Sequence, residues 1–144
     1  MPGVPVEVLK RVPLFADLNR REAAQVARLF KERRFAKGET VAREGSGGAA
    51  FFLIDSGEAS VSVGGRSRAT LKPGDYFGEI ALIDEGARSA TVTASSELVC
   101  WGLTFWDFRP LVQGNAALSW KLLQSLAKRL RDAERRDPED GSGS

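Results

Sequence analysis

The middle of the chain constrains the fold most, because short apolar runs alternate there with glycine-containing turns. Turn signals recur at Lys37-Gly38, 45–48, Ser56-Gly57, Gly64-Gly65 and 73–75. Between them lie runs rich in β-branched and aromatic residues, at 51–54, 59–63, 69–71, 90–94 and 98–101. Many short strands at this spacing indicate an antiparallel barrel or jelly roll. In the second run, Val61 and Val63 alternate with serines, which predicts a half-exposed strand.

A helical pattern precedes this β-rich zone, which we place between Arg33 and Leu103. Asn19 followed by Glu22 has the form of a capping box, and apolar residues then recur at helical spacing as far as Phe30. The earlier segment 12–15 is apolar and is expected to anchor on the core. We therefore predict a helix that starts after Asn19.

Two further helices are expected after the β-rich zone. Thr104 and Asp107 resemble a second capping box, and Pro110 is expected to interrupt or kink the short helix that they open. Asn115 can cap a longer helix with an apolar stripe formed by Leu118, Leu122, Leu123, Leu126, Ala127 and Leu130. The fold class is thus mainly β with flanking helices. Residues 1–136 are expected to form one domain and the polar residues 137–144 a disordered tail.

The residue inventory narrows the chemistry. The chain contains no histidine, which excludes catalysis by histidine, metal sites with histidine ligands and a haem bound by histidine. A single cysteine, Cys100, permits neither an internal disulfide nor a metal cluster, and its place in a predicted strand indicates a buried, inert thiol. We therefore expect a protein that is not an enzyme and that has no metal site or cofactor.

Neither the net charge nor the hydropathy of the chain indicates a nucleic acid or a membrane as partner. The 144 residues carry 21 Lys and Arg against 19 Asp and Glu, and a net charge of +2 is too small to argue for DNA binding. No apolar run approaches the roughly 20 residues that a membrane span requires, and the N-terminus lacks a signal-peptide layout. A cytoplasmic location is expected, without direct binding to DNA or to a membrane.

Segment 77–92 has the features of a phosphate-binding site. Gly78 allows close approach of another backbone at a strand end, and the free amides of a short helical turn after Glu79 would attract an anion. Arg88, nine residues after Glu79, can add a charge-assisted pair of hydrogen bonds to the same phosphate. A carboxylate beside a phosphate repels it, so Glu79 would need another target, such as a sugar hydroxyl. The alternative is a surface ion pair between Glu79 and Arg88 without any ligand.

This segment resembles the phosphate-binding cassette of cyclic nucleotide-binding domains, which occur in bacterial catabolite-activator-type regulators, protein kinase A regulatory subunits and nucleotide-gated channels. Segments 37–45, 52–59 and 71–79 resemble the strand and turn blocks that precede the cassette in that family. The likeness covers roughly residues 12–131. It implies an antiparallel β jelly roll with an N-terminal helix and C-terminal lid helices.

The resemblance also implies roles for individual residues. Glu79 would accept a hydrogen bond from the ribose 2′-hydroxyl, and Arg88 would pair with the cyclic phosphate. Gly78 would permit the close approach. Further ligand contacts are expected from the Ser89 hydroxyl, from backbone amides near Ile80, Ala81, Ser89 and Ala90, and from Leu71 and Ala81 as wall residues. Arg129, on the last helix, would lie near the pocket mouth, although a solvated helix charge is the more common role for such a residue.

The family likeness leaves the ligand and the output open. We favour cAMP over cGMP on family prevalence, since Ser89 is intermediate between the residues that accompany each nucleotide; cyclic dinucleotides are an alternative. The expected function is a small regulatory sensor whose lid helix moves on binding, with a possible homodimer through that helix. Trp120 is expected in the core or an interface, and the lysines and arginines of this helix on a solvated face. The alternatives are a dimerisation module with a vestigial pocket, the ligand-binding part of a larger transcription regulator, and a cupin-like enzyme, which the lack of histidine opposes.

Overall fold

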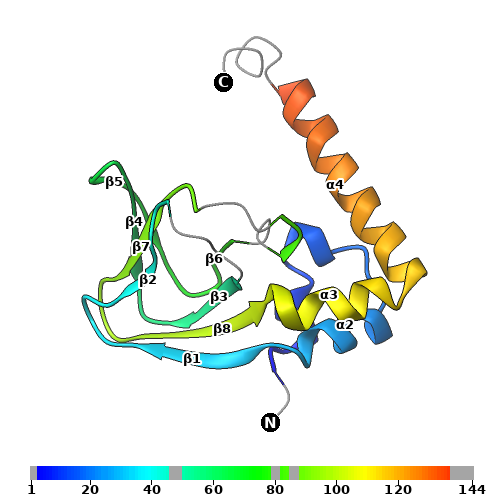
Figure 1. The fold of residues 1–144 in the computed structure, drawn as a ribbon, viewed down its shortest axis with the longest axis horizontal. Coiled ribbons are helices and arrows are strands. Elements are labelled where there is room, and N and C mark those ends of the chain that lie inside the picture. Colours follow the sequence, from blue (N-terminus) through cyan, green and yellow to red (C-terminus); the bar gives the residue numbers. More distant parts are fainter. Residues whose placement is uncertain (1–2, 46–49, 79–81, 85–87, 137–144) are drawn as a thin grey trace.

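Two antiparallel sheets form the body of the molecule in the computed structural model, which describes residues 3–45, 50–78, 82–84 and 88–136 (Figure 1). In this part of the chain one four-stranded sheet has the order β1-β8-β3-β6 and the other the order β2-β7-β4-β5. The strands are β1 (Lys31–Phe35), β2 (Thr40–Ala42), β3 (Ala50–Ser56), β4 (Ala59–Val63), β5 (Arg66–Leu71), β6 (Tyr76–Phe77), β7 (Thr91–Ala94) and β8 (Leu98–Thr104). The predicted mainly-β fold is confirmed.

Helices lie at one end of these sheets (Figure 1). They are α1 (Val6–Leu9), the 3-10 helix η1 (Pro13–Phe15), α2 (Arg20–Ala27), α3 (Phe105–Gln113) and the 21-residue α4 (Ala116–Arg136). Helix α4 packs against η1 and α3 and then rises away from the strands. None of the helices among the described residues has the length and apolar character of a membrane span.

The predicted helix starts are confirmed by their hydrogen bonds. Asn19 Oδ1 accepts from the Glu22 N–H at 2.8 Å, and Glu22 Oε1 accepts from the Asn19 N–H at 2.9 Å, so the capping box is complete. Thr104 Oγ1 accepts from the Asp107 N–H at 3.1 Å. Asn115 Oδ1 accepts from the Leu118 N–H at 3.0 Å. Each bond satisfies an amide at a helix start that has no partner within the helix.

Two boundaries differ from the sequence prediction. Strand β1 begins at Lys31 rather than Arg33, and the apolar runs did not include it because its first four residues are charged and exposed. Such charges suit an edge strand, which pairs with β8 on one side only. Helix α3 continues through Pro110 to Gln113, so the predicted interruption is wrong.

Two apolar clusters hold the fold together. One joins the helices to the sheet ends through Phe15, Phe51 and Phe108, with Phe15 ring centroids 6.1 Å from both partners. The segment 12–15 anchors there, as predicted, because Val12, Leu14 and Phe15 are fully buried. The other cluster lies between the sheets and contains Phe35, Phe52, Ile54, Val92, Leu98 and Cys100.

Candidate functional site

A cavity of about 150 Å³ opens on the sheet formed by β2, β7, β4 and β5. Its apolar part comes from one residue of each neighbouring strand, and its polar part from the segment that leads into β7. The described lining residues are Ala42, Val61, Leu71, Phe77, Gly78, Arg88, Ser89, Ala90 and Val92. The cavity therefore combines an apolar floor with one cation and one hydroxyl.

Arg88 supplies that cation from a half-buried position. Its Nη2 donates to the backbone carbonyl of Ala50, at the start of β3, at 2.5 Å. Burial lowers the pKa of the Arg88 guanidinium, although an arginine in a protein stays protonated at neutral pH. No ion pair joins Arg88 to a carboxylate in the described part of the chain. A partly desolvated cation whose acceptor among the described residues is a neutral carbonyl is well suited to bind an anion.

Gly78 makes the position of Arg88 possible. Its φ is +87°, a conformation that L side chains rarely adopt. A Cβ at this position would lie 2.7 Å from the Ala50 carbonyl oxygen and would overlap the Arg88 guanidinium. The absence of a side chain thus lets strand β3, the end of β6 and the arginine meet at one point.

Hydrogen bonds from a neighbouring turn fix the backbone next to Arg88. The Gly45 N–H donates to the Arg88 carbonyl at 2.9 Å, and the Glu44 N–H donates to Thr91 Oγ1 at 2.9 Å. Glu44 Oε1 in turn accepts from the Gly64 N–H in the β4–β5 turn at 2.9 Å. Sequence reasoning did not assign Glu44 or Thr91 to the site, because their contacts join residues 20 and 47 positions apart.

The structure brings five of the predicted site residues together around the cavity: Leu71, Gly78, Arg88, Ser89 and Ala90. The predicted Glu79, Ile80 and Ala81 lie outside the described residues, as does the predicted tail 137–144. Arg129 lies on α4 and is not among the lining residues, so the structure does not bring it to the cavity.

Two other hollows are larger but lack this combination of groups. A groove of about 380 Å³ runs along α3 and is lined by Leu82, Ile83, Phe105, Phe108, Arg109, Val112 and Gln113. Another, of about 300 Å³, lies where β1 ends beside the start of β8. Neither contains a residue that the sequence assigned to the site, and we therefore place the candidate site at the smaller cavity.

The other reactive groups that the structure describes do not form a second chemical site. Cys100 is fully buried, as predicted, and burial raises the pKa of its thiol to about 11. Within the described residues no group of three or more His, Cys, Asp or Glu side chains could hold a metal ion.

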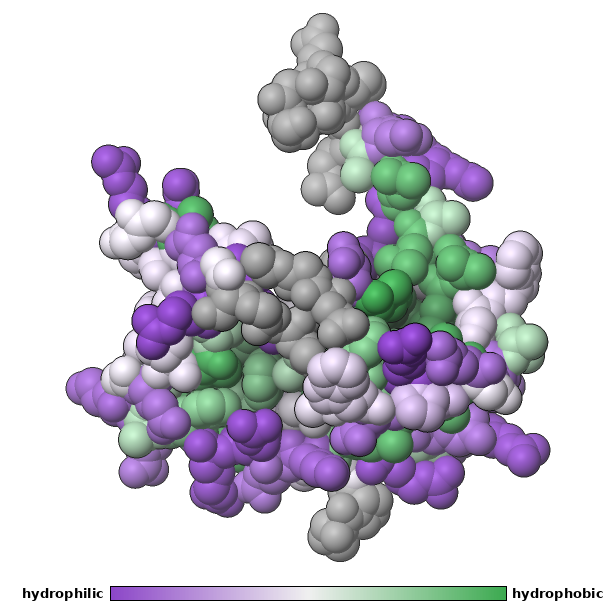
Figure 2. Space-filling view, in the orientation of Figure 1, coloured by the Kyte–Doolittle hydropathy of each residue, from purple (hydrophilic) through white to green (hydrophobic). Residues whose placement is uncertain are grey.

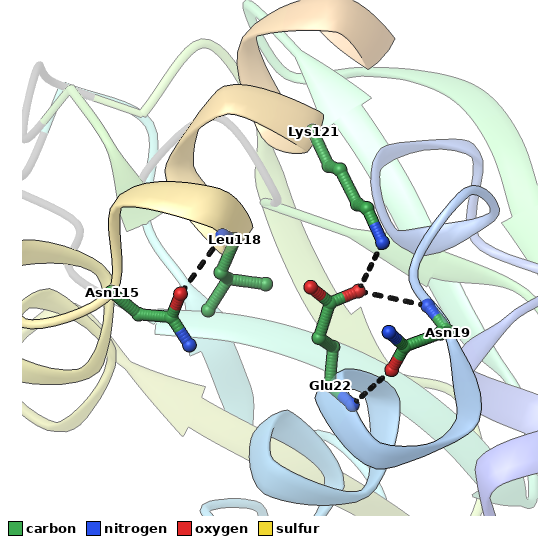
Figure 3. A network of polar contacts seen from close by, with 5 residues as sticks. All are labelled: Asn19, Glu22, Asn115, Leu118 and Lys121. Atoms are coloured by element: carbon green, nitrogen blue, oxygen red, sulfur yellow. Dashed lines mark hydrogen bonds and ion pairs between the residues drawn. The ribbon is translucent and has the colours of Figure 1, made fainter.

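Helix α4 differs from its prediction at Lys121, and several of its apolar residues are exposed. Leu118 and Leu122 are buried in the core, but Trp120 is 63% exposed and does not lie in the core of the single chain. Leu123 and Leu130 are also exposed, at 56% and 64%, and apolar surface follows the rising helix in Figure 2. Lys121, expected on a solvated face, instead forms an ion pair with Glu22 on α2 at 2.7 Å (Figure 3).

Comparisons with known proteins agree with this site. A family model described as the cyclic nucleotide-binding domain matches residues 32–115. The cAMP-dependent protein kinase regulatory subunit of Yarrowia lipolytica is 46% identical over 92 residues, which are 62% of this chain and 24% of that protein. The cyclic AMP receptor protein of Thermus thermophilus is 33% identical over 131 residues, covering 88% of this chain and 61% of that protein. The chain thus spans about a quarter of the kinase subunit.

Among solved structures, the N-terminal domain of a transcriptional regulator from Streptomyces coelicolor is similar with a TM-score of 0.82 and 29% identity. The match covers 89% of this chain and 95% of that one. The catabolite activator protein of Thermus thermophilus matches with a TM-score of 0.66 and 32% identity, over 86% of this chain and 61% of that chain.

Proposed function

The chain belongs to the cyclic nucleotide-binding domain family, and we propose that it is a small regulatory sensor that binds a cyclic nucleoside monophosphate, cAMP in preference to cGMP. The residues that the family model matches, 32–115, contain every described residue that lines the cavity. We place the ligand in that cavity, with its phosphate at Arg88.

The observation that carries this proposal is the state of Arg88. Its guanidinium is half-buried at the cavity, held by the Ala50 carbonyl and in contact with no carboxylate of the described residues. Binding of a phosphate would provide a countercharge through two parallel hydrogen bonds. The Ser89 hydroxyl, which also lines the cavity, is the second phosphate donor in this proposal. Glu79 is assigned the ribose hydroxyl, and amides near Ile80, Ala81 and Ala90 the remaining phosphate oxygens.

The size of the cavity supports a role for α4 as a lid. Pockets that enclose drug-sized ligands measure about 300–1,000 Å³, whereas this cavity measures about 150 Å³. We propose that it holds the ribose and phosphate and that the base lies at its mouth. No described residue of α4 lines the cavity. A movement of α4 toward the mouth would therefore add contacts to the base that are absent from the present arrangement.

The preference for cAMP rests on the relatives. Five of the matched proteins are named as cAMP-dependent protein kinase regulatory subunits and one as a cyclic AMP receptor protein. Two others are cGMP-dependent protein kinases, and the one from Eimeria tenella is 34% identical over 125 residues. Ser89 stands at the position that separates the two preferences. Both nucleotides therefore belong in the binding experiment.

The test is calorimetric titration of cAMP and cGMP into the purified chain and into Arg88→Ala, after any co-purified nucleotide has been removed. Arg68→Ala is the matched control, because Arg68 is an exposed arginine on β5 outside the cavity. We expect binding to the wild type and to the control, and a loss of at least 100-fold in Arg88→Ala, since about 3 kcal/mol of charge-assisted hydrogen bonding is removed. Equal affinities of the two variants would contradict the proposal.

A dimerisation module with a vestigial pocket is the second candidate, favoured by the exposed apolar residues of α4. Trp120, Leu123, Ala127 and Leu130 follow one another at alternating spacings of three and four residues, the pattern of a coiled-coil seam. We propose that this seam pairs with a second copy of the chain. Light scattering of the wild type and Leu123→Asp tests it, and a dimer indifferent to nucleotide would favour the second candidate over the sensor.

The remaining parts of the proposal concern the rest of the molecule. Residues 1–136 would form one regulatory domain without catalytic activity, located in the cytoplasm, and acting without direct contact to DNA or membrane. In a larger transcription regulator the same domain would be the ligand-binding part, as the match to the N-terminal domain from Streptomyces coelicolor suggests.

A further inference from the structure

Two ion pairs join α4 to the N-terminal helical region, on the side of the molecule that does not line the cavity. Lys121 Nζ lies 2.7 Å from Glu22 Oε1 on α2, and Lys128 Nζ lies 3.1 Å from Asp17 Oδ2, between η1 and α2. The two lysines are seven residues apart and so project from the same side of the helix. Figure 3 shows Lys121 extending from α4 to the carboxylate of Glu22.

The pair between Lys121 and Glu22 is the better protected of the two. The Glu22 side chain is 11% exposed and that of Lys121 32%, whereas both Lys128 and Asp17 are largely open to solvent. Glu22 Oε1 also accepts the Asn19 N–H of the capping box. The hydrogen bond from Lys121 and that from Asn19 lower the pKa of Glu22. A charged pair with this geometry and burial contributes more than a surface pair does.

Buried residues on the same side of α4 add to these two ion pairs, and one of them, Ser125, is unfavourable there. Leu118 and Leu122 are buried in the core. Ser125 is also buried, and its Oγ has no hydrogen-bond partner among the described residues. A buried hydroxyl without a partner costs free energy that an alanine would not. We call this arrangement, with both ion pairs formed and Leu118 and Leu122 buried, the docked position of α4.

We propose that Glu22 and Asp17 are positioning residues that hold α4 in the docked position, and that the docked position is the low-affinity state for nucleotide. This inference rests on the proposed function, in which α4 must approach the cavity to contact the base. A ligand can shift such an equilibrium only by its differential affinity for the two states. Every contact made only in the docked position therefore reduces the apparent affinity for nucleotide. Residues that never touch the ligand would thus set how much ligand the sensor needs.

The test measures cAMP affinity by calorimetry in the full chain and in variants of the docked position. Lys121→Met removes an ion pair that forms only in the docked position and so weakens that position alone. We therefore expect the affinity for cAMP to rise about tenfold, and to a similar extent in Glu22→Gln. Lys128→Met should raise it by no more than about fivefold, since that pair is exposed. Ser125→Ala should act in the opposite direction and lower the affinity by about fivefold, because it removes the unpaired hydroxyl from the docked position.

The matched control is Lys31→Met, which removes another lysine from an ion pair, the one with Asp107, without touching α4. Its affinity should stay within about twofold of the wild type. Unchanged or weaker binding in both Lys121→Met and Glu22→Gln would overturn the proposal. So would tighter binding in Ser125→Ala.

A nucleotide-free measurement separates this proposal from the proposed function. Hydrogen exchange of the α4 amides should be faster in Lys121→Met than in Lys31→Met in the absence of any ligand, because the docked position is weakened. If no variant binds cAMP or cGMP, the proposed function fails, and the exchange result alone decides whether Glu22 holds α4. Equal exchange in the two variants would show that it does not.

Discussion

Substitution of Gly78 by alanine tests the geometry of the candidate site most directly. At φ +87° the backbone of Gly78 is in a conformation that costs an L residue about 1–2 kcal/mol. The added Cβ would also lie 2.7 Å from the Ala50 carbonyl oxygen and overlap the Arg88 guanidinium. Arg88 would have to give up its bond to Ala50, and a hydrogen bond to a charged group is worth about 1.5–3 kcal/mol. The combined loss of stability is therefore about 2.5–5 kcal/mol.

Gly74→Ala provides the matched control, because Gly74 has nearly the same backbone conformation and no neighbouring atom. Its φ is +94°, and a Cβ there would find nothing within 4 Å. The control should lose only the conformational part, about 1–2 kcal/mol. The difference between the two variants therefore isolates the close approach of Gly78, Ala50 and Arg88.

Two assays read out the effect of the two glycine substitutions. Denaturant unfolding gives the free energies of unfolding, and calorimetry gives the affinity for cAMP. We expect Gly78→Ala to be less stable than Gly74→Ala by about 1.5–3 kcal/mol and to bind cAMP at least tenfold more weakly, since its arginine is displaced. Equal stability and equal affinity of the two variants would refute the reasoning, because the position of Arg88 would then not depend on the missing side chain.

Three further predictions follow from other contacts. The pKa of Glu22 is lowered in the folded chain by its hydrogen bond from Lys121, so the associated stability is present above the ordinary pKa of 4.5 and is lost as the pH falls through the folded-state pKa. The melting temperature should therefore fall more steeply between about pH 6 and pH 3 for the wild type than for Glu22→Gln. Cys100, with its pKa raised to about 11 and its side chain buried, should resist alkylation at pH 8 until the chain unfolds, and rapid labelling of the folded protein would contradict its placement. Thr91→Val removes the acceptor of the Glu44 N–H and should weaken cAMP binding about three- to tenfold with little change in melting temperature, while unchanged affinity would show that this bond does not position Arg88.

The parts of the fold that could be predicted from the sequence are those determined by neighbouring residues. The turn signals fix where strands end, and the capping residues Asn19, Thr104 and Asn115 fix where helices begin. Strand β1 was missed because pairing with β8, rather than an apolar pattern, makes it a strand. Pro110 does not interrupt α3, because the burial of Phe105 and Phe108 on the core offsets the helical hydrogen bond that a proline cannot donate.

The candidate site divides in the same way. Gly78, Arg88 and Ser89 could be assigned from one short segment, since phosphate recognition needs a few groups close together in the chain. The bond between Glu44 and Thr91, which supports that segment, joins residues 47 positions apart. The bond between Lys121 and Glu22, which attaches α4, joins residues 99 positions apart. Such contacts leave no periodic or motif signal. Both residues of the latter pair were visible in the sequence, one as a capping residue and the other as a surface charge, but not as partners.

Different parts of the molecule would control ligand recognition and the position of α4. The phosphate contacts that we propose would lie within the sheets and a short segment and would be present whether α4 is docked or not, so they would add affinity without favouring either position. The contacts that do favour one position lie on α4 and on the N-terminal helices, outside the cavity. If the chain acts as the proposed sensor, substitutions there would change the nucleotide concentration at which it responds while leaving ligand recognition intact. On these proposals affinity and specificity would vary independently, because different residues would determine them.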